Sequence, residues 1–184
     1  MKKNLLTFLC FLLVMNANAQ EIWQKVLQIE ASASGKKDRI SIPKTEHYYK
    51  LNLASFKQAL QNAPMRGQNS TVILPFPDGN GKMQNFIIYE APVMHPNLAA
   101  RYPDNKSYVG QEVENRSTVI RFSVTLFGLH TMTLAVNNGT SYIEPYSKDG
   151  NYYVSYLREG LTTNFPFECH TADVQSKLSI DEVS

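Results

Sequence analysis

Cysteine is nearly absent from the 184 residues, which include only Cys10 and Cys169. Cys10 lies inside the apolar run from Leu5 to Met15, which follows two lysines and precedes the small-residue pattern Ala17-Asn18-Ala19. This order is typical of a secretory signal peptide, so we expect a signal peptide at residues 1–19, cleavage near Ala19/Gln20 and a secreted or periplasmic chain. Cys169 is then the only thiol, which excludes a disulfide within the mature chain.

Net charge and further long apolar runs are also missing. The whole chain has 18 Lys and Arg against 16 Asp and Glu, and the signal peptide takes two of the lysines, so the mature chain is formally neutral. A neutral chain has no electrostatic attraction for nucleic acids or anionic membranes. No other apolar run approaches the roughly 20 residues that a membrane-spanning helix needs. We therefore expect no nucleic-acid partner and, after signal cleavage, no membrane partner.

The common catalytic patterns are absent from the sequence as well. The four histidines form no H-E-x-x-H pair, and no G-x-S-x-G elbow or phosphate-binding glycine loop is present. His130 lies in an alternating strand pattern and is expected to be structural, whereas His95, beside Pro96 in a loop, is open between a structural role and a ligand role. The acidic residues offer no general acid–base pair. We expect no catalytic residues, no cofactor of its own and no enzymatic activity in this chain.

Short runs of β-branched and aromatic residues fill most of the mature chain, with turn residues between them, which favours strands. Within residues 118–125, for example, Ile120, Phe122 and Val124 fall on the opposite face from Arg121 and Ser123. Similar runs predict strands at residues 71–76, 83–90, 129–136, 141–145 and 152–158. Gly128 and the turns Asn137-Asn138-Gly139 and 148–151 join the four runs from 118 to 158 into an antiparallel meander. Pro77–Gly81 predicts a longer hairpin loop.

Helix is scarce in the sequence. Leu53, Phe56 and Leu60 share one helical face before Pro64, and Pro96–Arg101 predicts a second short helix. We therefore predict a mainly β (α+β) fold with an antiparallel sheet or meander, sandwich- or barrel-like, and one or two short helices. The expected segments are the signal peptide at 1–19, an N-terminal segment at 20–37 with a flexible stretch at 31–37, a β-rich domain at 38–170 and a polar tail at 171–184.

Two other patterns have simple explanations. Tyrosines at positions 142, 146, 152, 153 and 156 could stack on carbohydrate, but cross-strand packing explains their spacing better. Asn-x-Ser/Thr patterns begin at positions 69, 115 and 138, where turn chemistry explains the asparagine.

Cys169 has two open roles. It follows the apolar segment Phe165-Pro166-Phe167, so it could be the last buried residue of the domain. Alternatively, its thiolate could bind a zinc ion that belongs to another domain, because a thiolate is a good zinc ligand. A catalytic zinc keeps one coordination place for water, and a cysteine in that place removes the nucleophile. His170, the next residue, would then favour loss of the thiol proton.

Six short pieces of the sequence suggest a family. They are ILPFPDG (73–79), FIIYEAPVMHPNLAARYP (86–103), KSYVG (106–110), GLHTM (128–132), YIEPYS (142–147) and YYVSYLR (152–158). In this order they resemble the N-terminal propeptide of secreted, reprolysin-like zinc metalloproteases of Bacteroidetes-type bacteria, over roughly residues 38–170.

The resemblance implies a propeptide-like domain that assists folding of a zinc metalloprotease catalytic domain and inhibits it, in cis or in trans. Zinc would belong to that partner, with Cys169 as the inhibitory metal ligand and His170 beside it. The catalytic domain is absent from this sequence, and residues 171–184 would be a polar tail or a linker to it. The alternative interpretation is a stand-alone exported β-rich binding or adhesion module with a buried Cys169.

Overall fold

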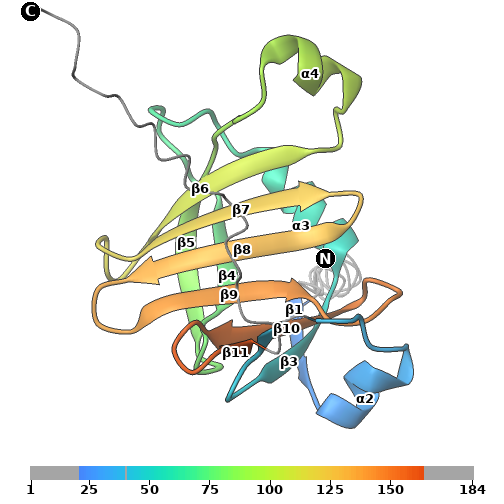
Figure 1. Cartoon of the computed structure of the whole chain (residues 1–184). Coiled ribbons are helices and arrows are strands. Elements are labelled where there is room, and N and C mark those ends of the chain that lie inside the picture. Colours follow the sequence, from blue (N-terminus) through green and yellow to red (C-terminus); the bar gives the residue numbers. More distant parts are fainter. Residues whose placement is uncertain (1–20, 40, 164–184) are drawn as a thin grey trace, which may run out of the picture.

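The computed structural model describes residues 21–39 and 41–163 of the chain. Nine antiparallel strands form one sheet that curls into a nearly closed, barrel-like body (Figure 1). The predicted mainly β fold is confirmed, and the described residues form three short helices rather than one or two. None of these helices has the length and apolar character needed to cross a membrane.

Most of the described elements are strands. In chain order they are β1 (Trp23–Val26), α2 (Gln28–Ala33), β2 (Ser41–Ile42), β3 (His47–Leu51), α3 (Leu53–Leu60), β4 (Ile73–Pro77), β5 (Met83–Glu90), α4 (Pro96–Arg101), β6 (Lys106–Glu112), β7 (Val119–Thr125), β8 (Gly128–Ala135), β9 (Gly139–Pro145), β10 (Tyr152–Leu157) and β11 (Thr162–Thr163). The strand order in the sheet is β1-β3-β10-β9-β8-β7-β6-β5-β4, and β11 pairs separately with β2. The predicted meander is therefore confirmed, and it extends from β4 to β10.

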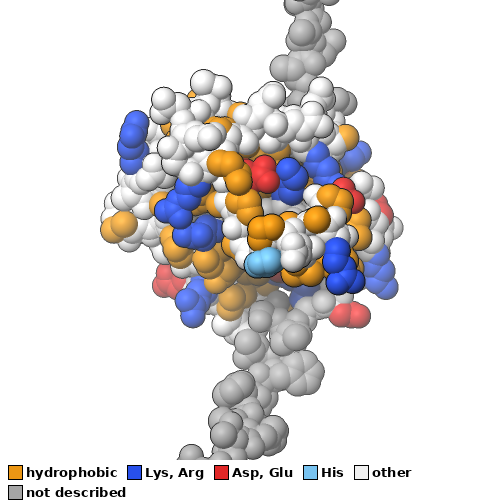
Figure 2. Space-filling view, turned by 90° about the horizontal axis from the view of Figure 1, so that it is seen from above, with side chains coloured by type: hydrophobic (Ala, Val, Ile, Leu, Met, Phe, Trp, Pro, Cys, Tyr) orange, Lys and Arg blue, Asp and Glu red, His pale blue; other side chains and the backbone are white. Residues whose placement is uncertain are grey.

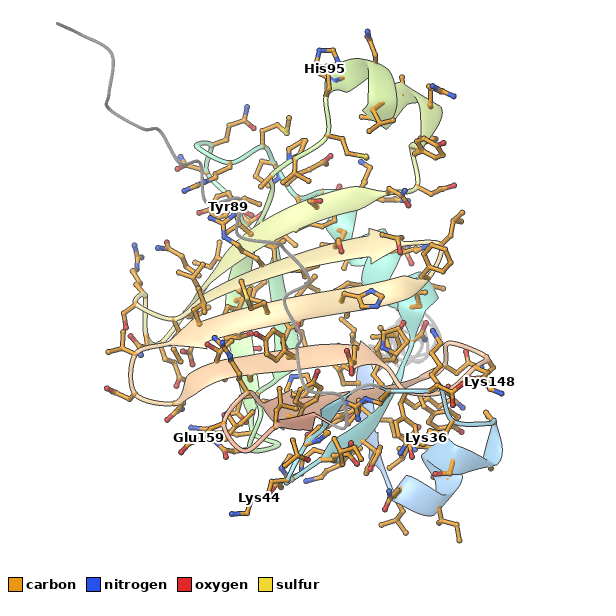
Figure 3. The ribbon with its side chains drawn as sticks, in the orientation of Figure 1. Lys36, Lys44, Tyr89, His95, Lys148 and Glu159 are labelled. Atoms are coloured by element: carbon orange, nitrogen blue, oxygen red, sulfur yellow. The ribbon has the colours of Figure 1, made fainter. Side chains whose placement is uncertain are left out.

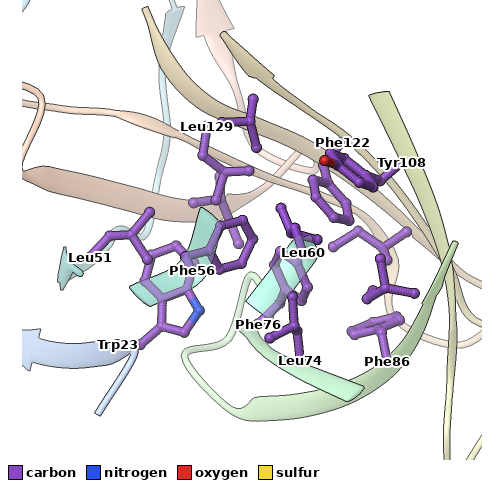
Figure 4. Packing of buried hydrophobic residues seen from close by; sticks show 14 of the residues in the cluster. Trp23, Leu51, Phe56, Leu60, Leu74, Phe76, Phe86, Tyr108, Phe122 and Leu129 are labelled. Carbon is purple, nitrogen blue, oxygen red and sulfur yellow. The ribbon is translucent and has the colours of Figure 1, made fainter. Parts of the chain in front are cut away.

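Alternation along each strand separates the core from the outer surface. On β7, Ile120, Phe122 and Val124 are at most 4% exposed, whereas Arg121 is exposed on the opposite face. This is the pattern expected when successive side chains point to opposite faces of a sheet. The enclosed core is rich in aromatic rings, and Figure 4 shows several of them packed together.

Helix α3 fills one side of this core. Asn52 caps it by accepting a hydrogen bond from the Ser55 amide at 3.0 Å. Phe56 and Leu60 lie on the face that packs against the inner surface of the sheet and are almost fully buried. The predicted helix is confirmed, and it ends before Pro64 as the sequence indicates.

A side chain links the two edge strands of the sheet, β1 and β4. Trp23, on β1, donates its indole N–H to the carbonyl of Pro75, on β4, at 2.7 Å. No backbone pairing joins these strands. Pro75 and Pro77 lack N–H donors, which limits how far β4 could pair with a further strand.

The loop between β4 and β5 completes the closure. Ser155 Oγ donates to the Asp78 carbonyl at 2.6 Å, and the Tyr49 hydroxyl donates to the Gly81 carbonyl at 3.1 Å. The Asp78 carboxylate turns the loop by accepting the amides of Asn80 and Lys82. This loop, predicted as a longer hairpin loop, therefore also ties one end of the meander to β3 and β10.

The prediction of a flexible stretch at residues 31–37 is wrong. Ala31 lies in α2 and is fully buried in a second, smaller cluster with Tyr48 and Tyr146. The Lys37 amide donates to the Tyr146 carbonyl at 2.9 Å. Small, polar residues suggested flexibility, but a small side chain at position 31 also allows the helix to lie close to aromatic rings. Since Trp23 belongs to the main core, residues 21–37 pack as part of the same body as the sheet.

Candidate functional site

A projecting arm, residues 91–105, leaves the sheet between β5 and β6 and contains α4. The predicted helix Pro96–Arg101 is confirmed, and His95 Nδ1 accepts a hydrogen bond from the Asn97 amide at its start. His95 therefore caps the start of this helix. In Figure 1 the helix stands away from the body above β6, and Figure 3 shows His95 at its outer end. None of the residues of α4 is buried.

The arm carries apolar side chains that the described residues leave uncovered. Val93 is 78% exposed, Leu98 is 43% exposed and Tyr102 is 49% exposed. Seen from above, the side on which α4 lies, hydrophobic side chains gather across the surface with Lys and Arg around them (Figure 2). A helix of this length is marginal in water by itself, and a gathered apolar surface is a mark of protein–protein contact. The arm is therefore a candidate docking surface.

The outer face of the sheet is a second candidate surface. The strand register places one row of side chains across six neighbouring strands, β5 to β10: Tyr89, Val109, Arg121, Met132, Tyr142 and Tyr156. Two shallow grooves adjoin along this row and share Arg121. One, of about 350 Å³, is lined by Val93 of the arm together with His130 and Tyr142. The other, of about 440 Å³, lies between the turn at residues 66–68 and strands β5 to β7.

A charged cluster joins the segment before β3 to the outer face of β9. Arg39 Nε donates to Glu144 Oε1 at 3.0 Å, Nη2 approaches the same oxygen at 2.8 Å, and Nη1 donates to Glu46. The guanidinium also lies over the Tyr156 ring, 4.9 Å from its centroid. Burial acts to lower the pKa of Arg39, but Glu144 and Glu46 outweigh it and raise the pKa overall. The cluster pairs the Arg39 charge with carboxylates of this chain, which ties residue 39 to β9.

The described histidines belong to separate environments. His47, on β3, packs against Gly81, His95 caps α4, and His130 lies on the outer face of β8. Reduced solvation lowers the pKa of His130; Glu144 acts to raise it and Lys37 to lower it further. Within residues 21–39 and 41–163, no group of three or more His, Cys, Asp or Glu side chains could hold a metal ion.

Cys169 and His170, the predicted metal-ligating residues, lie outside the described residues. The last described strand, β11, ends at Thr163, six positions before Cys169. Thr162 pairs with Ile42, so the chain is held to the body up to this point. The zinc-ligand role of Cys169 stays a prediction.

The tyrosines pack across strands as predicted. Tyr146 and Tyr153 are almost fully buried. The rings of Tyr142 and Tyr156, directly opposite each other on β9 and β10, lie 5.7 Å apart between centroids. Turn chemistry likewise explains Asn115, whose side chain accepts the amide of Ser117.

Sequence reasoning missed the grouping of Arg66 with Arg121 in the larger groove. Alternation on β7 already indicated that Arg121 faces outward. Arg66 lies in a turn fixed to the end of β5, where its amide donates to the Glu90 carbonyl at 2.9 Å. No local pattern in the sequence predicts that contact.

Comparisons with known proteins add no assignment: no family profile, no curated protein and no solved structure matches the chain.

Proposed function

We propose that this chain is a propeptide-like domain that binds the catalytic domain of a secreted zinc metalloprotease, assists its folding and inhibits it. The observation that carries the proposal is the projecting arm, whose apolar side chains have no covering partner among the described residues. Burying a large apolar side chain stabilises a complex by about 1.5–3 kcal/mol. The arm therefore offers a partner protein several kcal/mol of gross contact energy that the body of the domain does not use.

Inhibition would come from Cys169. The thiolate, not the thiol, binds zinc, so the Cys169 proton must be lost first, and His170 is the adjacent base that would take it. The sulfur would then displace the zinc-bound water and leave the protease without its nucleophile. Cys169 follows the end of β11 by six positions in the chain.

The test mixes the purified mature chain with catalytic domains of secreted reprolysin-like zinc metalloproteases from the same organism and measures peptide hydrolysis. We expect strong inhibition by the wild-type chain and loss of most of it in Cys169→Ser. Absence of inhibition of every domain would contradict the proposal. Inhibition unchanged in Cys169→Ser would leave a domain that blocks the active site sterically and would remove the thiolate role.

Variants of the arm test the docking surface separately. Leu98→Ser should weaken inhibition by about tenfold, which corresponds to about 1.4 kcal/mol, because it removes apolar area from the contact. Leu27→Ser is the matched control, since Leu27 is an exposed leucine (73%) directly before α2, which lies at the other end of the body from α4 in Figure 1. Equal effects of the two substitutions would show that the arm is not the contact surface.

The alternative function is a stand-alone exported binding module. The adjoining grooves on the outer face favour it, because binding at those grooves requires no protease. Thiol modification of the folded chain distinguishes the two functions. A Cys169 that is offered to a metal should react quickly, whereas a buried structural cysteine should react only after unfolding.

A further inference from the structure

The larger outer-face groove has a basic and amide-rich lining. Two arginines, Arg66 and Arg121, stand on opposite sides of it, with Gln68 and Gln111 beside them. Its floor includes Val109 and Val119, and Tyr89 stands at the β5 side, where Figure 3 labels it. The volume of about 440 Å³ falls within the range of about 300–1,000 Å³ that is usual for ligand clefts.

The two arginines of the groove carry uncompensated positive charge. Both side chains are exposed, and neither forms an ion pair with a carboxylate among the residues that the structure describes. None of the groove's lining residues is acidic. Glu90, which follows Tyr89 at the end of β5, pairs instead with Lys106 at 3.3 Å. The groove is therefore complementary to a negatively charged ligand.

The width of the groove across the strands indicates the form of that ligand. Strands in a sheet lie about 4.8 Å apart, so Tyr89 on β5 and Arg121 on β7 have backbones about 10 Å apart. An extended polypeptide rises about 3.3 Å per residue, so about three residues would cross this distance. Amide side chains between the charges can bond to a peptide backbone, and the valines can contact its side chains. A single phosphate would use only part of this lining.

We propose that this groove binds an extended acidic segment of a partner polypeptide, with carboxylate side chains held by Arg66 and Arg121. Guanidinium groups suit carboxylates because their paired N–H donors match the two oxygens. The proposal does not depend on protease inhibition, because the ligand is defined by its charge alone.

The test measures binding of a fluorescent Asp/Glu-rich decapeptide by anisotropy at low and at about 0.15 M ionic strength, where the Debye length is about 8 Å. We expect Arg121→Ala and Arg66→Ala each to weaken binding by about tenfold, and the Asn/Gln counterpart of the peptide to bind much more weakly. Lys50→Ala, which removes an exposed cation of β3 outside the groove, is the matched control and should bind as the wild type does.

Each other outcome would overturn the proposal. Equal losses in Lys50→Ala and Arg121→Ala would indicate nonspecific attraction by net charge. Competition by millimolar inorganic phosphate as effective as that by the peptide would indicate a simple anion site, and absence of peptide binding would remove the site. Peptide binding and protease inhibition are measured in separate assays, so failure of this site and failure of the propeptide function are distinguishable.

Discussion

Replacing Trp23 with phenylalanine tests whether this one side chain holds the two edges of the sheet together. Its indole N–H donates to the Pro75 carbonyl at 2.7 Å, and its ring contacts the aromatic core, including Phe56 and Phe76 (Figure 4). Phenylalanine keeps an aromatic ring in the site but lacks the donor and the second ring. The substitution therefore removes the link between β1 and β4 without removing the core residue.

The expected loss of stability has two parts. Pro75 is half-buried, so water can partly replace the lost donor, and the missing hydrogen bond costs about 1 kcal/mol. The smaller ring leaves a void comparable with one or two buried methylene groups, which costs about 1–2 kcal/mol more. The sum is about 2–3 kcal/mol, and for a domain of this size it lowers Tm by about 5–10 °C.

Urea and thermal unfolding followed by far-UV circular dichroism measure this loss. Tyr49→Phe is a matched control inside the core, because it removes only the hydroxyl bond to Gly81 and should cost about 0.5–1.5 kcal/mol. Tyr102→Phe, on the exposed arm, should change stability by less than about 0.5 kcal/mol. A loss for Trp23→Phe as small as that of Tyr102→Phe would refute the reasoning, since it would mean that the edges are held elsewhere.

Three other perturbations have defined outcomes. Gly110→Ala should destabilise the domain by about 1–3 kcal/mol in urea unfolding, because its Cβ would stand 2.7 Å from Ile88 Cδ1 in the core. The lowered pKa of His130 in the folded state means that protonation favours unfolding, so stability should fall as the pH drops from about 7 to 5, and His130→Gln should reduce that slope in unfolding experiments across pH. Burial acts to raise the pKa of Asp149, but hydrogen bonds, first among them that from Ser147, lower it to about 2; Asp149→Asn should therefore be less stable than the wild type at pH 7, with the difference vanishing as the pH falls toward 2.

Local patterns in the sequence were sufficient to predict the meander and two of the three described helices, α3 and α4. Alternation on β7 assigns Phe122 to the core and Arg121 to the outer face, and the structure confirms both. Helical spacing at Leu53 and Phe56 predicts α3 because a one-sided apolar face is visible within eight residues. Each of these predictions depends on residues that are close together in the chain.

Closure of the barrel-like body could not be predicted because it depends on residues far apart in the chain. Trp23 and Pro75 are separated by 52 positions, and Arg39 and Glu144 by 105. In a different fold, each of these residues could have contacted many other partners. The same reason explains the wrong prediction of flexibility around Ala31, since its burial depends on Tyr146 more than a hundred positions away.

The candidate surfaces were predictable only in part. The helix of the arm was predicted, but its exposure was not, because the sequence does not show that β5 and β6 pair directly beneath it. Arg121 was predicted to face outward, yet its position opposite Arg66 depends on where a turn outside the sheet packs. A groove lined from several elements leaves no periodic signal in any one of them.

The sequence pieces that carry the family resemblance differ in whether the packing of the fold requires their residues. ILPFPDG supplies Leu74 and Phe76, which are buried in the core, and Asp78 of the loop that closes the body. The fold itself therefore requires these residues. KSYVG likewise supplies Gly110, where a side chain would strike the core. The arm within FIIYEAPVMHPNLAARYP is different, because none of its helical residues is buried and the body would keep its core without them.

The stability of the fold therefore explains the buried residues of these sequence pieces, but it does not explain the apolar side chains of the arm. The side chain of Leu98, for example, is 43% exposed and belongs to neither of the two buried clusters. Contact with a partner is the role that we propose for this surface. A substitution of Leu98 should leave the free energy of unfolding unchanged while it weakens binding to a partner. A variant that lost both stability and binding would show that the arm contributes to the stability of the fold.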